Sequence, residues 1–75
     1  MKNLRESEQY QSMNFYRAVS MAEGFSDDDD AGDQFAILCA WQYIADNELW
    51  KQLQGFFGRA VFDLIEQGLI SPPVA

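Results

Sequence analysis

Four consecutive aspartates, Asp27 to Asp30, are followed closely by Asp33 and are bracketed by Gly24 and Gly32. Carboxylates gathered in this way can coordinate a hard cation such as Ca²⁺ or Mg²⁺. They can also imitate the phosphates of a nucleic acid and bind a basic protein surface. A third alternative is a solvated loop that serves solubility only.

The metal hypothesis fails at the ligand positions of a calcium-binding loop. In a loop that starts at Asp27, Gly32 falls at the position of the invariant glycine. The fifth position is Ala31, however, and the last is Leu38, where a bidentate glutamate is needed. The chain also has no histidine, the commonest metal ligand and general base. We therefore expect no metal site and no cofactor.

Catalysis is equally unsupported by the sequence. Without histidine there is no serine–histidine arrangement. A small bundle with few polar residues at its core positions also offers no obvious pocket in which a pKa could be perturbed. We expect that the protein is not an enzyme.

The charge balance favours a protein partner. The chain has 12 acidic and 5 basic residues and a net charge of −7, whereas binding to phosphates requires surplus Lys and Arg. An anionic membrane surface is disfavoured for the same reason. A partner with a basic surface would be attracted and steered towards the protein. The candidate partner-binding residues are Glu23, Asp27, Asp28, Asp29, Asp30 and Asp33.

The composition predicts a folded, helical domain. With 48% hydrophobic and 15% aromatic residues, the chain is too apolar to be disordered. No segment alternates between polar and apolar residues as a strand does. We expect a single all-α domain over residues 1–75, a small bundle of three to four helices with an acidic loop between the first and the second. Residues 1–6 are expected to be frayed, and residues 71–75 to form a C-terminal tail.

The first two helices are predicted on both sides of the aspartates. The first begins at Ser7 or Ser12 and ends at Glu23, with Gly24 as the residue that adopts a positive φ after it. The second spans about 32–46 and is apolar on nearly all sides, which predicts a central, buried element. Because carboxylates stabilise a helix N-terminus, at least one aspartate is expected to cap this helix.

The third helix is predicted from Glu48 to about residue 67 and closes at Gly68. Gly55 and Gly58 interrupt it, and each costs about 1 kcal/mol relative to alanine. Either they let the second helix approach closely, or they mark a kink between a helix over 48–54 and another over 56–67. The predicted core includes Trp41, Leu53, Phe57 and Leu64.

Arg59 lies one turn before Asp63 on this helix. We expect a surface ion pair between them, which would stabilise the helix by a few tenths of a kcal/mol. The alternative is that Arg59 binds a carboxylate near the acidic loop or the second helix.

The single cysteine, Cys39, lies in the apolar run Phe35 to Trp41 and is expected to be a buried, unreactive thiol. It permits no intrachain disulfide, which suits a reducing compartment. Neither a signal peptide nor an apolar stretch of about 20 residues is present. We expect a soluble, cytoplasmic protein.

Residues 36–70 resemble a pattern found in small phage and prophage proteins. The pattern has an A-W-Q stretch (Ala40 to Gln42), then Asp46, an L-Q-G-aromatic-aromatic-G-R-x-A stretch (Leu53 to Ala60) and an L-I-x-x-G ending (Leu64 to Gly68). Small acidic phage proteins of this kind resemble inhibitors of host machinery, including anti-CRISPR proteins.

The resemblance implies a phage-encoded inhibitor that acts in the host cytoplasm as a monomer or homodimer. Its partner would be a host protein with a basic nucleic-acid-binding surface, such as a CRISPR-Cas effector subunit, bound stoichiometrically through the acidic loop. It would contact neither nucleic acid nor membrane itself. The alternative is a structural or regulatory phage protein that assembles through an apolar helix surface, without mimicry of nucleic acid.

Overall fold

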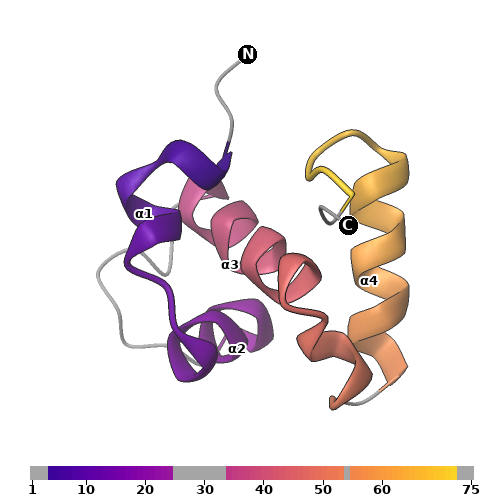
Figure 1. Cartoon of the computed structure of the whole chain (residues 1–75). Helices are drawn as coiled ribbons and strands as arrows, with labels where there is room; N and C mark the ends of the chain where they lie inside the picture. Colours follow the sequence, from indigo (N-terminus) through magenta and orange to yellow (C-terminus); the bar gives the residue numbers. More distant parts are fainter. Residues whose placement is uncertain (1–3, 25–33, 54, 73–75) are drawn as a thin grey trace.

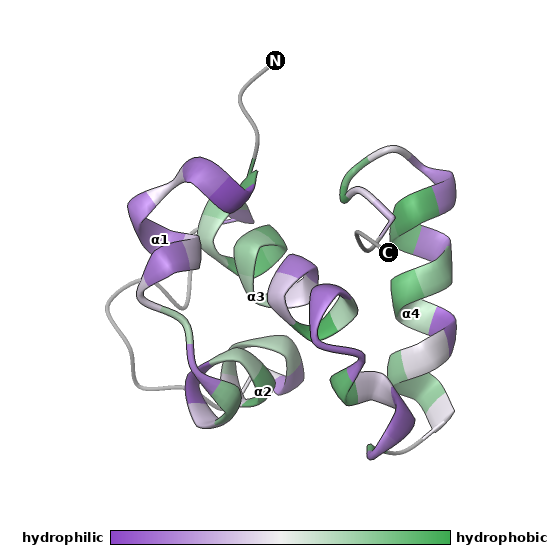
Figure 2. Cartoon of the chain, viewed as in Figure 1, coloured by the Kyte–Doolittle hydropathy of each residue, from purple (hydrophilic) through white to green (hydrophobic). Residues whose placement is uncertain are grey.

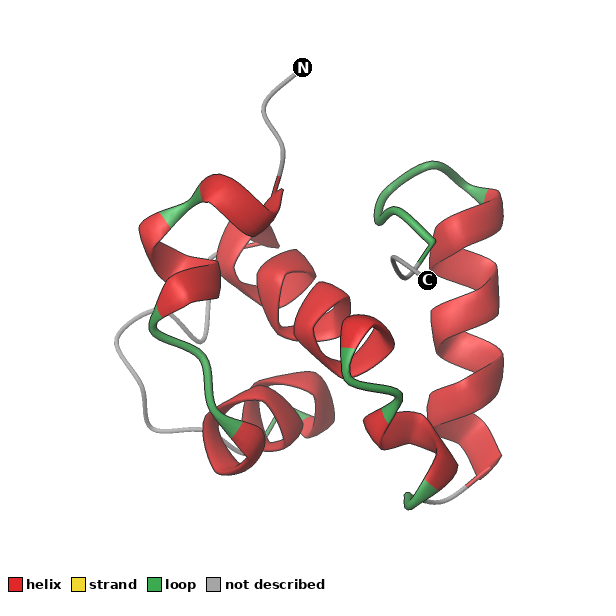
Figure 3. Cartoon of the chain, viewed as in Figure 1, coloured by secondary structure: helices red, strands yellow, loops and turns green. Residues whose placement is uncertain are grey.

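The computed structural model describes residues 4–24, 34–53 and 55–72. Within these ranges the elements are η1 (Leu4–Glu6), α1 (Glu8–Gln11), α2 (Phe15–Glu23), α3 (Gln34–Asp46), η2 (Leu49–Lys51) and α4 (Gly55–Glu66), where η denotes a 3-10 helix. The described residues contain no strand (Figure 3). The predicted all-α fold is confirmed. The acidic loop, with Asp27 to Asp30 and Asp33, lies outside the described residues.

A continuous first helix from Ser7 is wrong, because residues 7–23 form two helices, α1 and α2, and the alternative start at Ser12 is closer to the observed start of α2 at Phe15. Asn14 starts α2, because its side-chain oxygen accepts the backbone N–H of Arg17 at 2.8 Å. Ser7 starts α1 in the same way and accepts the N–H of Tyr10 at 3.2 Å. Each capping oxygen satisfies an N–H that has no partner within the helix. The predicted end at Gly24, which has a φ of 80°, is confirmed.

The prediction that residues 1–6 are frayed is also wrong for the part that the structure describes. Leu4–Glu6 forms η1, and the side chain of Arg5 is bonded to Asp46 at the end of α3. A bond to a distant helix cannot be read from local sequence, which is why this segment looked unstructured.

α3 is the central helix, as predicted, and its described part begins at Gln34. η1, α1 and α2 pack on one side of it, and η2 and α4 on the other (Figure 1). η1 and α1 are mostly hydrophilic, whereas apolar residues dominate α2 and the first half of α3 (Figure 2). The buried residues of α3 are Ala36, Cys39, Ala40, Trp41, Gln42, Ile44 and Ala45.

The third predicted helix is interrupted between η2 and α4, which supports the kink alternative. Gly55 is the first residue of α4. Gly58 does permit a close approach, but of Trp50 in η2 rather than of α3, because a Cβ at Gly58 would lie 3.2 Å from Trp50 Cε3.

α4 closes at Gly68, as predicted, and it does so through a Schellman motif. Gly68 has a φ of 77°. The N–H of Leu69 donates to the carbonyl of Leu64 at 3.0 Å, and that of Gly68 to the carbonyl of Ile65 at 3.0 Å. The chain then turns back towards α3.

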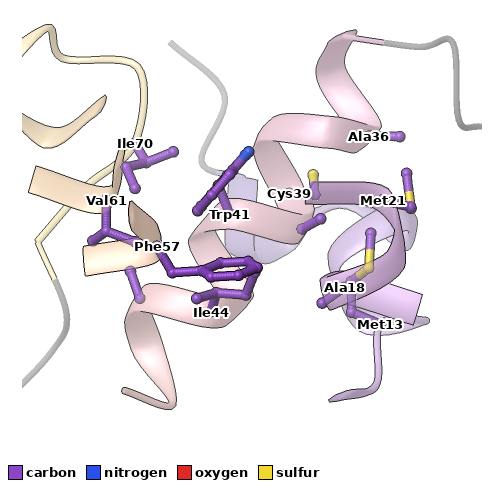
Figure 4. Close-up of a cluster of buried hydrophobic side chains, with 12 residues drawn as sticks. Met13, Ala18, Met21, Ala36, Cys39, Trp41, Ile44, Phe57, Val61 and Ile70 are labelled. Carbon is purple, nitrogen blue, oxygen red and sulfur yellow. The ribbon is translucent and has the colours of Figure 1, made fainter. Parts of the chain in front are cut away.

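The core joins α3 to both sides of the fold (Figure 4). The rings of Trp41 and Phe57 lie 5.7 Å apart between α3 and α4, and both residues are buried. Leu53 and Leu64 are partly buried and pack against this cluster. Cys39 is fully buried. No helix in the described part of the chain has the length and apolar composition needed to cross a membrane.

Candidate functional site

Glu23 is the one predicted partner-binding residue that lies within the described ranges. It is the last residue of α2 and is exposed. Gly24 then turns the chain out of the helix through its positive φ. Asp27 to Asp30 and Asp33 lie outside the described residues, so their prediction and that of an aspartate cap on α3 stay predictions.

A second acidic centre was not predicted, and within the described residues it joins four side chains in one hydrogen-bonded cluster. Asp46, the last residue of α3, receives both ends of the Arg5 guanidinium, with Nε 2.7 Å from Oδ2 and Nη2 2.6 Å from Oδ1. The hydroxyl of Tyr10 donates to Oδ2 at 2.7 Å. Gln42 donates to Oδ1 from one turn earlier at 3.1 Å. Because a carboxylate is disfavoured at the negative end of a helix, the Arg5 charge offsets an otherwise unfavourable position.

The same cluster holds the C-terminal segment. Arg5 Nη2 donates to the carbonyl of Pro72 at 2.8 Å. The Gln42 side-chain amide binds the main chain of Ser71 twice: its Nε2 donates to the Ser71 carbonyl at 2.9 Å, and its Oε1 accepts the Ser71 N–H at 2.7 Å. Gln42 is buried inside an apolar helix, and these bonds satisfy its amide.

The pKa values in the cluster are perturbed in the directions that the bonds require. Partial burial raises the pKa of Asp46, but the hydrogen bonds from Arg5 and Tyr10 outweigh it and hold that pKa below its usual value. The hydrogen bond to Asp46 raises the pKa of Arg5. Burial, then the bond to Asp46, raises the pKa of Tyr10 to about 12. All three groups are therefore held in the forms that make the bonds at neutral pH.

These contacts point to a structural role for Asp46. Its two oxygens already accept bonds from Arg5, Tyr10 and Gln42. Among the described residues, every buried side-chain nitrogen and oxygen has a hydrogen-bond partner. The sequence held one signal for this cluster: a glutamine within an apolar helix, one turn before its terminal aspartate. Nothing local to Arg5 indicated that it would join them.

Large apolar side chains are exposed on two separate parts of the surface. Phe15 and Tyr16 on α2 are 48% and 80% exposed, and Phe56 and Phe62 on α4 are 44% and 59% exposed. α2 and α4 lie on opposite sides of α3 (Figure 1). The rings of Phe62 and Trp50 pack in a T-shaped arrangement, with centroids 5.6 Å apart.

A small apolar groove of about 250 Å³ lies between α3 and the end of α4. Ile37, Leu38 and Trp41 form the α3 wall, and Leu64 and Leu69 form the other. Gln34, at the start of α3, is its polar lining residue. The volume falls below that of most sites for small molecules.

The expected ion pair between Arg59 and Asp63 is absent from the structure. Both residues are exposed, and within the described ranges neither takes part in an ion pair. An exposed pair at this spacing adds only a few tenths of a kcal/mol, so hydration of the two charges competes with it easily.

No group of three or more potential metal ligands is gathered within residues 4–24, 34–53 and 55–72. Comparisons with protein-family models, with curated proteins and with solved structures found no match. In the structure, the residues that carry the phage-protein pattern serve the fold: Trp41 and Phe57 in the core, Asp46 in the polar cluster, and Gly68 at the end of α4.

Proposed function

We propose that this protein is a phage-encoded, non-enzymatic inhibitor of the anti-CRISPR type. It binds a host defence complex stoichiometrically in the cytoplasm and occupies a basic surface that otherwise holds DNA or RNA. The observation that carries the proposal is the charge distribution. Most of the 12 acidic residues precede α3, namely Glu6, Glu8, Glu23, Asp27, Asp28, Asp29, Asp30 and Asp33.

The contacts of the described charges support this proposal. The cations Arg5 and Lys51 are engaged within the protein, Arg5 with Asp46 and Lys51 with Glu48 at 2.9 Å. By contrast, Glu6, Glu8 and Glu23 are exposed and join no ion pair within the described ranges. Uncompensated surface carboxylates attract a basic partner and accelerate its encounter.

The test uses a panel of guide-loaded CRISPR effector complexes and fluorescently labelled target DNA. We expect the wild-type protein to displace DNA from one of these complexes and to bind that complex directly in the absence of DNA. The double substitution Asp28→Asn with Asp29→Asn should weaken binding by at least tenfold. The matched control, Asp63→Asn with Glu66→Gln, removes the same charge from α4 and should change binding less than threefold.

Equal losses in the two variants would indicate a general charge effect and would contradict a specific role for the acidic loop. Displacement of DNA that survives the loss of Asp28 and Asp29 would contradict it as well.

A second candidate function is assembly through apolar surface, and the exposed aromatics favour it. Phe56 and Phe62 lie less than two turns apart on α4, and Phe15 and Tyr16 are neighbours on α2, so exposed rings occur in pairs on both helices. Exposed apolar patches mark protein interaction sites. Under this function Phe62→Ser abolishes partner binding or self-association, whereas Asp28→Asn with Asp29→Asn has no effect. Sedimentation velocity over a range of protein concentrations measures self-association directly.

A further inference from the structure

The segment after α4, Leu69 to Pro72, crosses back towards α3 and covers the interface between the two helices (Figure 1). Ile70 is only 4% exposed and packs into the cluster that contains Trp41, Phe57 and Val61 (Figure 4). Leu69 forms part of the wall of the apolar groove. We call this segment the strap.

The strap contains no helix, and its hydrogen bonds to α3 come from the side chain of Gln42. Gln42 binds both main-chain groups of Ser71, at 2.7 and 2.9 Å. Arg5 binds the carbonyl of Pro72 at 2.8 Å. The N-terminal turn η1 therefore contributes directly to holding the strap, although the two segments are separated by 67 positions in the sequence.

A second route joins the same two segments. Gln42 Nε2 is shared between the Ser71 carbonyl and Asp46, and Asp46 is bonded to both ends of the Arg5 fork. Loss of Arg5 therefore removes one bond to the strap outright. It also removes the ion pair that fixes the Asp46 carboxylate, which in turn orients the Gln42 amide that binds Ser71.

We propose that Arg5, Asp46 and Gln42 form a latch that couples the two ends of the chain, so that the strap opens when η1 is released. Opening lifts Ile70 from Trp41 and Phe57 and removes the Leu69 wall of the groove. The groove then extends into the core between α3 and α4. Short segments of this kind, with few buried side chains, open at lower free energy than the whole fold.

The test is hydrogen exchange of the Ser71 amide, followed by NMR on the full chain at constant pH. In Arg5→Gln the Ser71 amide should exchange at least tenfold faster than in the wild-type protein, while the amides in the middle of α3 and α4 change less than twofold. The matched control is Lys51→Gln, which breaks the surface pair with Glu48. It should leave Ser71 unchanged.

A second variant, Arg5→Lys, tests the latch if Arg5→Gln does not fold. Arg5→Lys keeps the charge but loses the planar guanidinium that bonds both oxygens of Asp46, so it should accelerate Ser71 exchange by an intermediate factor. Binding of an apolar fluorescent dye should rise in the same order as the exchange rates. Ser71 exchange that stays within twofold of wild type in Arg5→Lys and in folded Arg5→Gln would overturn the latch. So would a uniform acceleration of all amides.

Discussion

Trp50 lies against the bare backbone of Gly58, so close that a Cβ on Gly58 would come within 3.2 Å of Trp50 Cε3. The Trp50 ring also contacts Phe62, one turn further along α4. These contacts fasten η2 onto the first half of α4 and fix the direction in which α4 leaves the break. A glycine that costs helix stability is thus used for a tertiary contact.

The substitution Gly58→Ala compares two opposing effects, the gain in intrinsic helix stability and the loss of the close Trp50 contact. Alanine should add about 1 kcal/mol of helix stability, but displacement of Trp50 should cancel most of this gain. In a Trp50→Leu background, where the ring is gone, the same substitution should realise the full gain. Chemical denaturation of the four proteins in this double-mutant cycle measures the difference. Identical effects of Gly58→Ala in both backgrounds would show that the close contact carries no energy.

Truncation of the core pair should be severe. Trp41→Ala and Phe57→Ala each remove a buried ring and should cost about 3 to 5 kcal/mol. Such a loss is a large part of the stability of a small domain. The control is Tyr16→Ala, which removes a ring that is 80% exposed and should change stability by less than about 0.5 kcal/mol. Denaturation midpoints followed by circular dichroism compare them, and a mild effect at Phe57 would assign that ring to a binding surface instead.

Stability should fall at alkaline pH because of Tyr10. Its pKa is raised to about 12 in the folded protein, from 10.0. The folded state therefore holds this proton more tightly than the unfolded chain. The contribution of Tyr10 is complete below pH 10 and is lost as pH rises towards 12. The stability difference between wild type and Tyr10→Phe should shrink over that interval, as measured by urea denaturation. A constant difference would contradict the raised pKa.

Chelation should leave the fold intact. The sequence lacks a complete calcium loop, so neither the helices nor the core should depend on a metal. We expect excess EDTA to shift Tm by less than about 1 °C. Removal of an ion that binds and stabilises the native state would lower Tm by more than this. Scanning calorimetry with and without added Ca²⁺ measures this. A large increase in Tm on addition of Ca²⁺ would contradict this prediction and would indicate that the aspartates bind metal.

Partner binding through the acidic loop should depend steeply on salt. Exposed charges are screened beyond about 8 Å at physiological ionic strength. The association rate with the effector complex should therefore fall as salt rises, and the dissociation rate should change less. Replacement of Asp27, Asp28, Asp29 and Asp30 by Asn should flatten this dependence while the helical circular dichroism spectrum stays the same. Stopped-flow or surface-based kinetics at several salt concentrations provide the measurement, and an unchanged slope in the variant would exclude the loop from the interface.

The sequence determined the features that depend on neighbouring residues. The helical fold class, the central place of α3 and the glycine ends at Gly24 and Gly68 follow from local periodicity and from the steric freedom of glycine at positive φ. Trp41 and Phe57 were predicted to be core residues because they lie on the apolar faces of their helices. These properties need no knowledge of what the chain meets elsewhere.

Tertiary structure decided the rest, because those contacts join residues that are distant along the chain. Arg5 and Asp46 are 41 positions apart, and no local pattern pairs one cation among several with one carboxylate among many. The sequence alone did not decide whether the helix is interrupted between η2 and α4, since Gly58 is compatible both with a kink and with a close approach of another side chain. Trp50 resolved it by packing against Gly58, a contact that forms only when the chain folds back on itself.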